Sequence, residues 1–307
     1  MQLSLTHQVV EKIIRYRNNP ILFCKEQCKI QHPTKGMIPF QTFPAQEQCI
    51  RDFLQHRFNI ILKSRQIGIS TVVGGYCFWK MVFFPHQQIR VVATKKETAQ
   101  IIITMAYNML QSCDPEILRV LNAQPISEAK QTVELANGSR MTSFAQGKGE
   151  NPDTGVGTAL SLLVIDEAAL IKRAEDIWTT IYPTLSQGGD CIILSTPRGN
   201  KNWFAEKYKK ATNMEYSQGE IPFNAIKLMW WENLDRINPP ETPLTTDLSV
   251  PGGKSNSWSK GMFAGMSLKE IAQEYCVAED TIITLRDKET NKIFDITFKE
   301  LWENENK

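Results

Sequence analysis

The sequence predicts an α/β protein in which helices flank a mostly parallel β-sheet. Short apolar runs that end in turns alternate with segments of helical periodicity, and this alternation is typical of such a sheet. The runs are apolar throughout, as expected for strands buried on both faces. The 307 residues are 42% hydrophobic and 22% charged, which allows a large core and excludes wholesale disorder. No stretch approaches the roughly 18 uninterrupted apolar residues of a membrane-spanning helix, so we expect no membrane partner.

The individual elements follow from periodicity and turn residues. Helices are predicted over residues 6–17, 46–58, 70–83 and 97–112, and strands over 59–62, 89–93, 132–135, 140–144, 162–165 and 191–194. Asn137-Gly138-Ser139 joins two of these strands as a hairpin turn. In the helix over 46–58 we expect Ile50, Phe53 and Leu54 to face the core.

The stretch 33–44 is marked by Pro and Gly, and the stretch 238–261, rich in Pro, Thr, Gly and Ser, is expected to be a long loop or linker. A short helix over 267–275 begins at Ser267, with Glu270 at the capping-box position. Strands over 281–285 and 292–297 complete the chain. Seven scattered cysteines without a CxxC pair favour reduced, intracellular thiols.

The segment from Lys63 to Thr71 lies between a buried strand and a helix, which is the context of a phosphate-binding loop. Gly68 would provide the tight turn, and the N–H groups that open the helix would face an anion. Ser70 stands where a hydroxyl would ligate Mg²⁺. Compared with GxxxxGK[ST], Lys63 replaces the first glycine and Ile69 takes the place of the usual lysine. We therefore expect Lys63 to reach the β- and γ-phosphates, while a plain strand–turn–helix with surface cations remains open.

An apolar strand over 162–165 ends in Asp166 and Glu167. Asp166 would hold Mg²⁺ and Glu167 would polarise the attacking water, the division of labour that phosphoryl transfer requires. An ordinary acidic helix N-cap is the alternative, but the phosphate loop upstream favours function. The next strand ends in Ser195-Thr196, whose hydroxyls are placed to sense a γ-phosphate. Gln46 is a candidate for adenine, although on the sequence alone an exposed helix residue is the simpler interpretation.

Taken together, these residues resemble the ATPase domain of the large terminase subunit of tailed bacteriophages. The resemblance covers about residues 15 to 275 and rests on the Ser64–Ser70 loop, the Val164–Glu167 strand end, Ser195-Thr196 and Gln46. It implies a P-loop NTPase fold of the ASCE type with a small helical or lid subdomain, and ATP and Mg²⁺ as ligands. The nucleotide-binding residues that it implies are Gln46, Lys63, Ser64, Arg65, Gln66, Gly68, Ser70, Thr71, Ser195 and Thr196.

The resemblance leaves the charge-stabilising arginine open. Many family members have an arginine shortly before the acidic strand, where this chain has Val156. Arg65, which we expect to act as a second cation on the phosphates, and Arg198 are the candidates.

The same resemblance implies DNA packaging. The motor would act in the host cell cytoplasm as a homo-oligomer on the portal protein, with double-stranded DNA and the small terminase subunit as partners. The implied domains are an N-terminal helical or lid segment (1–45), the ATPase core (46–212) and a lid and linker segment (213–275) towards a nuclease domain that is not recognisable here. A helicase-like DNA translocase and, because of Ile69, a non-hydrolysing DNA-binding scaffold are the alternatives.

Residues 276–307 resemble the N-terminal block of an intein. A leading Cys276 is followed by Asp280-Thr281, a strand pair and Phe298–Leu301. Cys276 would attack the Tyr275 carbonyl to form a thioester, because a thiol is both nucleophile and leaving group. All four histidines precede this tail, so splicing would require a second, nuclease-bearing polypeptide with the C-terminal intein piece. The net charge of +2 is also unevenly distributed along the chain, since residues 276–307 hold 5 Lys+Arg and 8 Asp+Glu. A β-hairpin at a truncated terminus remains the alternative.

Overall fold

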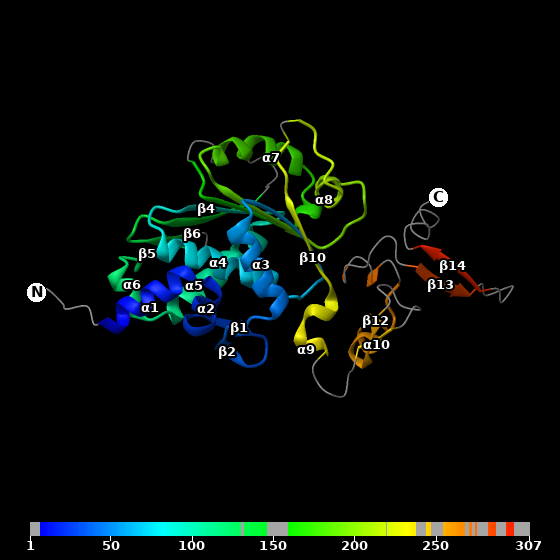
Figure 1. The fold of residues 1–307 in the computed structure, drawn as a ribbon, viewed down its shortest axis with the longest axis horizontal. Coiled ribbons are helices and arrows are strands. Elements are labelled where there is room, and N and C mark those ends of the chain that lie inside the picture. The colour runs from blue at the N-terminus through cyan, green and yellow to red at the C-terminus, as the bar shows by residue number, and fades with distance from the viewer. Residues whose placement is uncertain are drawn as a thin grey trace, which may run out of the picture.

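The computed structural model describes residues 7–129, 132–145, 159–218, 220–237, 244–246, 254–267, 270, 271, 274, 282–286 and 293–297. Its main feature is an eight-stranded β-sheet with the order β10-β3-β9-β8-β4-β7-β6-β5, between two layers of helices (Figure 1). The strands are β3 (Phe58–Lys63), β4 (Gln88–Ala93), β5 (Pro125–Ala129), β6 (Thr132–Leu135), β7 (Arg140–Ala145), β8 (Leu162–Asp166), β9 (Asp190–Ser195) and β10 (Asn224–Leu228). The six strands from β10 to β7 pair in parallel, and β6 and β5 add two antiparallel neighbours. The predicted mostly parallel α/β sheet is confirmed.

The register of the central strands brings their carboxyl ends to one edge of the sheet. Leu62 of β3 lies opposite Ser195 of β9, and Asp166 of β8 lies opposite Leu194. Parallel strands all end at the same edge, where ligands of α/β proteins bind. The fold therefore gathers there the residues that follow β3, β8 and β9.

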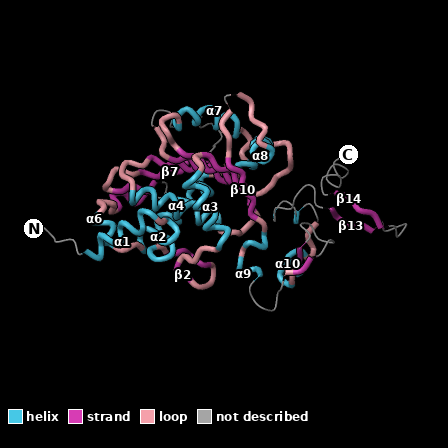
Figure 2. The backbone as a smooth tube through the Cα atoms, in the orientation of Figure 1, coloured by secondary structure: helices cyan, strands magenta, loops and turns pink. Residues whose placement is uncertain are grey.

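Helices cover both faces of the sheet (Figure 2). One face carries α1 (His7–Asn18), α2 (Pro20–Gln27), α3 (Pro44–Gln55), α4 (Ile69–Phe83), α5 (Lys96–Ser112) and α6 (Pro115–Val120). The other carries η1 (Ala168–Leu170), α7 (Ala174–Ile181), η2 (Tyr182–Leu185) and α8 (Trp203–Asn213). Successive side chains of β8 point alternately into the two cores, with Val164 in the first and Leu163 and Ile165 in the second. Because both faces are covered, every residue of β8 is buried.

Three small two-stranded sheets lie outside the main sheet. They pair β1 (Lys29–His32) with β2 (Gly36–Pro39), β11 (Thr245–Thr246) with β12 (Lys254–Ser255), and β13 (Ile282–Arg286) with β14 (Ile293–Thr297), all antiparallel. Among the described residues, further helices are η3 (Trp230–Glu232), α9 (Leu234–Ile237) and α10 (Ser257–Phe263). Within the part of the chain described, no helix has the length and apolar character needed to cross a membrane.

The Pro- and Gly-marked stretch 33–44 contains β2, and α3 starts at Pro44. Two expectations about local structure were wrong. Leu54 is 49% exposed, since the buried arc of α3 is centred on Gln46, Cys49, Ile50 and Phe53 and Leu54 lies on its flank. The stretch 238–261 contains α10, whose Trp258 stacks on Trp230 with ring centroids 5.4 Å apart. The packing of Trp258 on Trp230 stabilises a helix here despite the loop-like composition around it.

Candidate functional site

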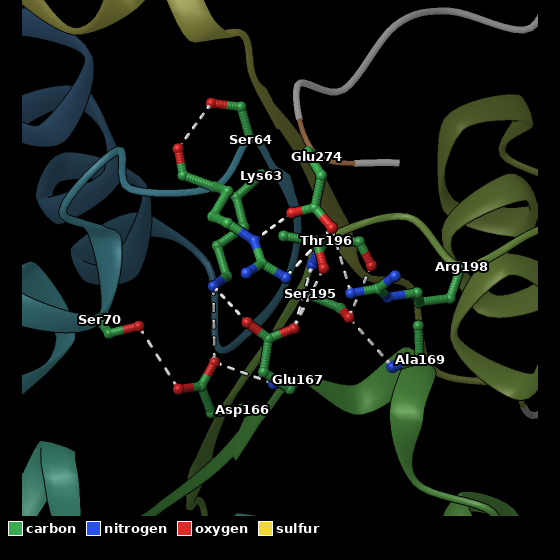
Figure 3. Close-up of polar contacts among 11 residues, drawn as sticks. Lys63, Ser64, Ser70, Asp166, Glu167, Ala169, Ser195, Thr196, Arg198 and Glu274 are labelled. Atoms are coloured by element: carbon green, nitrogen blue, oxygen red, sulfur yellow. Dashed lines mark hydrogen bonds and ion pairs between the residues drawn. The ribbon is translucent and has the colours of Figure 1, made fainter. Parts of the chain in front are cut away.

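Lys63 and the acidic pair form the centre of the site (Figure 3). Lys63 is the last residue of β3, and Asp166 and Glu167 close β8, two strands away in the sheet. The Lys63 ammonium lies 2.8 Å from Glu167 Oε1 and 3.9 Å from Asp166 Oδ1. Lys63 is 8% exposed and Asp166 is 5% exposed, so these charges are largely removed from water. Buried charges persist in proteins when they are paired in this way.

Burial and pairing act against each other on the two carboxyl groups. Burial raises the pKa of Asp166, and the neighbouring Glu167 adds to this effect, while Lys63 opposes it. Burial also favours protonation of Glu167, but Lys63 and the hydrogen bonds from Thr196 outweigh it and hold the pKa of Glu167 below its ordinary value of 4.5. Two adjacent carboxyl groups with pKa values pushed apart can take different roles. Glu167 is thereby kept ionised, as a general base must be.

Ser70 and Asp166 offer an oxygen pair that suits a magnesium ion. Ser70 opens α4, and its Oγ lies 3.4 Å from Asp166 Oδ2. A hydroxyl and a carboxylate are the hard oxygen donors that Mg²⁺ prefers, with the rest of its ligands being waters and phosphates. The two oxygens are close enough to be neighbouring ligands of one ion, so the donor set fits Mg²⁺. Across the described residues, no cluster of three or more His, Cys, Asp or Glu side chains offers another metal site.

The backbone between β3 and α4 turns twice into the left-handed region. Gln66 has φ 56° and Gly68 has φ 76°. Left-handed residues alternating with right-handed ones turn successive N–H groups to the same side and form an anion-binding concavity. A Cβ at Gly68 would lie 2.7 Å from Gln46 Nε2, so only glycine fits this turn. Thus the expected role of Gly68 has a steric reason.

Gln46 is buried in α3 and supports the loop from the side. Its Nε2 donates to Ile67 O at 2.9 Å, and its Oε1 accepts from Phe43 N at 3.0 Å. The exposed-helix interpretation of Gln46 is therefore wrong, because its amide ties α3 to the loop. Ile69, which takes the place of the usual lysine, is buried in the core, so the cation of the site comes from Lys63.

Ser195 ends β9, the strand between β3 and β8, and Thr196 follows it. Thr196 donates to Glu167 Oε2 from both its backbone N, at 3.5 Å, and its Oγ1, at 3.3 Å. Ser195 Oγ accepts from Ala169 N at 3.1 Å, just after the acidic pair. These contacts link the end of β9 to the acidic pair.

Thr71, in the first turn of α4, borders a cavity of about 550 Å³ together with Gln31 and Met105.

Arg65 and Arg198 converge on one carboxylate, that of Glu274. Figure 3 shows the contact between Arg198 and Glu274. Arg65 Nη2 lies 3.1 Å and Arg198 Nη2 3.3 Å from Glu274 Oε1, and Arg65 Nε pairs with Glu274 Oε2. The backbone N of Arg65 also donates to Glu274 O, at 2.5 Å. Both arginines proposed from the sequence thus reach the same point. Val156 and Cys276 lie outside the described residues.

Sequence reasoning missed three residues that hold the loop. They are Glu274, Arg236 and Asn233; Arg236 and Asn233 both donate to Gln66 O, at 3.1 and 3.2 Å. Arg236 also donates to the buried Ser64, with its Nη1 3.4 Å from Ser64 Oγ. All three residues follow the sheet in sequence, and no motif marks them. The tryptophans around Arg236 were the only available signal of a packed segment.

Residues 60–243, more than half of the chain, match the family described as "Terminase large subunit, T4likevirus-type, N-terminal". The chain belongs to this family. The matched range of this terminase chain contains Lys63, the loop, the acidic pair and Ser195-Thr196. Of the residues that meet at the loop, Gln46 and Glu274 lie outside the matched range.

Solved structures of phage terminases share the fold of this chain. The large terminase ATPase domain of Thermus phage P74-26 is 19% identical with a TM-score of 0.58, and the match covers 77% of this chain and 93% of that one. The large terminase of bacteriophage HK97 is 16% identical with a TM-score of 0.52, covering 68% of this chain and 43% of that one. At such identities the likeness concerns the fold. This terminase chain spans less than half of the HK97 protein.

Proposed function

We propose that the chain is the ATP-hydrolysing motor part of a phage terminase large subunit, which drives double-stranded DNA into the capsid. The observation that carries this proposal is the meeting of Lys63, Ser70, Asp166 and Glu167 at the carboxyl ends of the central strands. A cation, a hydroxyl–carboxylate pair and an ionised carboxylate are what P-loop hydrolysis of ATP needs. In domain terms, 1–45 would be a helical or lid segment, 46–212 the ATPase core and 213–275 the lid and linker, although β10 joins the main sheet from this last range.

The loop and its cations would bind the phosphates. N–H groups between Gln66 and Ser70 would face the anion, and Lys63 would move from Glu167 to the β- and γ-phosphates. Arg65 and Arg198 leave Glu274 to neutralise the charge that develops during transfer. Ser70 and Asp166 would hold Mg²⁺, which supplies charge neutralisation and orients the phosphates.

Glu167 would perform the chemical step on water. Its lowered pKa keeps it ionised, so it accepts a proton from the water that attacks the γ-phosphate. Thr196 holds Glu167 Oε2, so a shift of Glu167 during hydrolysis is passed to the end of β9. The Ser195-Thr196 segment would in this way couple hydrolysis to movement. Gln46, tied to Ile67 at the loop, would read adenine.

The decisive experiment measures phosphate release from ATP in the presence of Mg²⁺. Lys63→Ala and Glu167→Gln should each lower turnover at least 100-fold, and Glu167→Gln should still bind ATP. Ile69→Ala should keep turnover, although loss of a buried side chain costs about 2–4 kcal/mol of stability. Circular dichroism checks folding. Turnover indifferent to Lys63 would refute the loop assignment, and absence of turnover in the folded wild type would favour the scaffold alternative.

The packaging role is separated from a helicase-like translocase by a capsid requirement. The motor would assemble as a homo-oligomer on the portal protein, with the small terminase subunit presenting DNA. We expect ATP-dependent protection of double-stranded DNA from nuclease only when procapsids bearing a portal are present. Strand separation without capsids would instead support the helicase alternative.

We also propose that residues 276–307 are an N-terminal split-intein piece. The supporting observation is that β13 and β14 form an antiparallel pair of their own, as the intein resemblance implies. Cys276 Sγ would attack the Tyr275 carbonyl carbon; the C–N bond breaks, the amine of Cys276 takes the proton of the thiol, and a thioester remains. A partner polypeptide with the C-terminal intein piece would accept the acyl group and add a nuclease domain.

Mixing with the matching C-terminal fragment tests the splicing proposal. We expect ligation of the two flanking sequences with release of residues 276–307, and Cys276→Ala should abolish it. Cleavage after Tyr275 by an added thiol would support thioester formation. If the folded wild type shows neither cleavage nor ligation, the splicing proposal is refuted and the tail is a hairpin without splicing activity.

A further inference from the structure

One arginine outside the phosphate loop contacts it at several points. Arg236, at the end of α9, is 5% exposed. Its Nη2 donates to Arg65 O at 2.7 Å and to Gln66 O at 3.1 Å, and its Nη1 lies 3.4 Å from Ser64 Oγ. A buried guanidinium that holds consecutive backbone carbonyls is a costly arrangement unless its geometry is satisfied. Here Nη2 alone donates to both carbonyls, and the planar, forked guanidinium lets Nη1 reach Ser64 Oγ at the same time.

These carbonyl contacts determine where the amide groups of the loop point. In a trans peptide the carbonyl oxygen and the following N–H point in opposite directions. When Arg236 holds the oxygens of Arg65 and Gln66 on its own side, the N–H groups of Gln66 and Ile67 turn to the opposite side. Gln66 also adopts φ 56°, a left-handed conformation that costs energy in a residue with a Cβ. The hydrogen bonds from Arg236 offset that cost.

Arg236 is itself held by the segment that follows the sheet. The guanidinium carbon lies 4.7 Å from the centre of the Trp258 ring, and Asn256 Nδ2 donates to Arg236 O at 2.8 Å. Asn233 adds a second side-chain donor to Gln66 O at 3.2 Å. Thus η3, α9 and α10 form a support for the loop that lies outside the loop's own sequence.

We propose that Arg236 is a positioning residue that keeps the phosphate loop in its anion-binding shape. By fixing the carbonyls of Arg65 and Gln66, it presents the N–H groups of Gln66 and Ile67 to the phosphates of a nucleoside triphosphate. The inference rests on the proposed ATPase function. Arg236 would thus contribute to nucleotide affinity without contacting a phosphate.

The test compares Arg236→Lys, which keeps the charge but loses the fork, with wild type. We measure the Kd of a non-hydrolysable ATP analogue with Mg²⁺, and the KM and kcat of ATP hydrolysis. Arg236→Lys should raise Kd and KM about tenfold or more, because charge-assisted hydrogen bonds to the loop are lost, with kcat at saturation within about twofold. Asn233→Ser, which retains an oxygen to cap Asp235 N, should raise both constants by a smaller factor.

Arg57→Lys is the matched control. Arg57 Nη2 also donates to two backbone carbonyls, those of Gly189 at 2.8 Å and Leu185 at 3.3 Å, and its guanidinium lies over the Phe58 ring. This control should leave Kd and KM unchanged. If Arg236→Lys lowers the unfolding midpoint but leaves Kd and KM at wild-type values, the positioning role is refuted. If Arg236→Lys fails to fold, unchanged constants in Asn233→Ser refute it. A folded wild type that binds no ATP analogue refutes the proposed function instead.

Discussion

Glu167 is held between two opposing demands. In the proposed hydrolysis it must be ionised to accept a proton from water, yet it is enclosed beside a second carboxyl group. Lys63 and Thr196 resolve this conflict, because both stabilise the ionised form and together lower the pKa of Glu167. The cost is that Lys63 is engaged with the two carboxyl groups and, in the proposed mechanism, must leave them to bind the phosphates.

Thr196→Val tests the hydroxyl's share in the ionisation of Glu167. The valine keeps the shape but removes the Oγ1 donor to Glu167 Oε2, so the pKa of Glu167 should rise. A carboxylate with a lowered pKa loses its base function only as pH falls through that low value. The acid limb of the kcat–pH profile should therefore move to higher pH in the variant. Thr179→Val, which removes an exposed bond to Glu175 O, is the control and should leave the profile unchanged. An unmoved acid limb in Thr196→Val would contradict the assignment.

The sequence predicted the residues at the strand ends and missed those that arrive from elsewhere. Lys63, Asp166 and Ser195 follow apolar runs, and parallel strands must end at a common edge, so their meeting could be anticipated. Arg236 and Glu274 carry no such pattern. Each reaches the loop through tertiary packing, which depends on how the chain returns after β10.

Helix α4, which starts at the phosphate loop, is packed tightly at Gly75. A Cβ at Gly75 would lie 3.0 Å from Cys24 Sγ and 3.3 Å from Phe40 Cε1. Gly75→Ala should therefore lower the free energy of unfolding by about 1–3 kcal/mol through overpacking. Urea unfolding with an unchanged m-value measures this loss.

Gly261 in α10 provides the comparison, because nothing lies within 4 Å of an added Cβ there. Gly261→Ala should leave the stability unchanged or raise it by up to about 1 kcal/mol, since alanine favours the helix. Equal effects of the two substitutions would show that the core around Gly75 adapts and that α4 is not tightly seated.

Elements were predictable where one pattern dominated. The strands β3, β4, β8 and β9 are apolar runs, and β6 and β7 flank a turn with Asn137-Gly138, so all were predicted close to their observed bounds. Strand β10 was missed because it alternates apolar and polar residues at the sheet edge, with Lys227 exposed. Helix α10 was hidden by Ser and Gly, and only Trp258 and Phe263 indicate its packed face.

At the scale of the whole molecule, the phosphate loop is a meeting point for distant segments. Gln46 of α3, Arg236 of α9 and Glu274 all contact residues between Arg65 and Ile67. The loop's shape therefore depends on contacts from segments before and after the sheet. If the loop binds nucleotide as proposed, a change in how the segment after β10 packs should alter that binding.

Glu274 makes this dependence measurable. Its carboxylate holds both Arg65 and Arg198, so phosphates that recruit these arginines must first displace it. Glu274→Gln removes the negative charge and should lower the KM for ATP about two- to fivefold, as expected for the loss of competing, partly exposed ion pairs. Glu270→Gln is the matched control, because it neutralises a charge in the same segment while the Ser267 capping contact is kept by a glutamine. Its KM should equal that of wild type. A KM that rises in Glu274→Gln would mean that Glu274 supports the arginines for phosphate binding instead of competing with the phosphates.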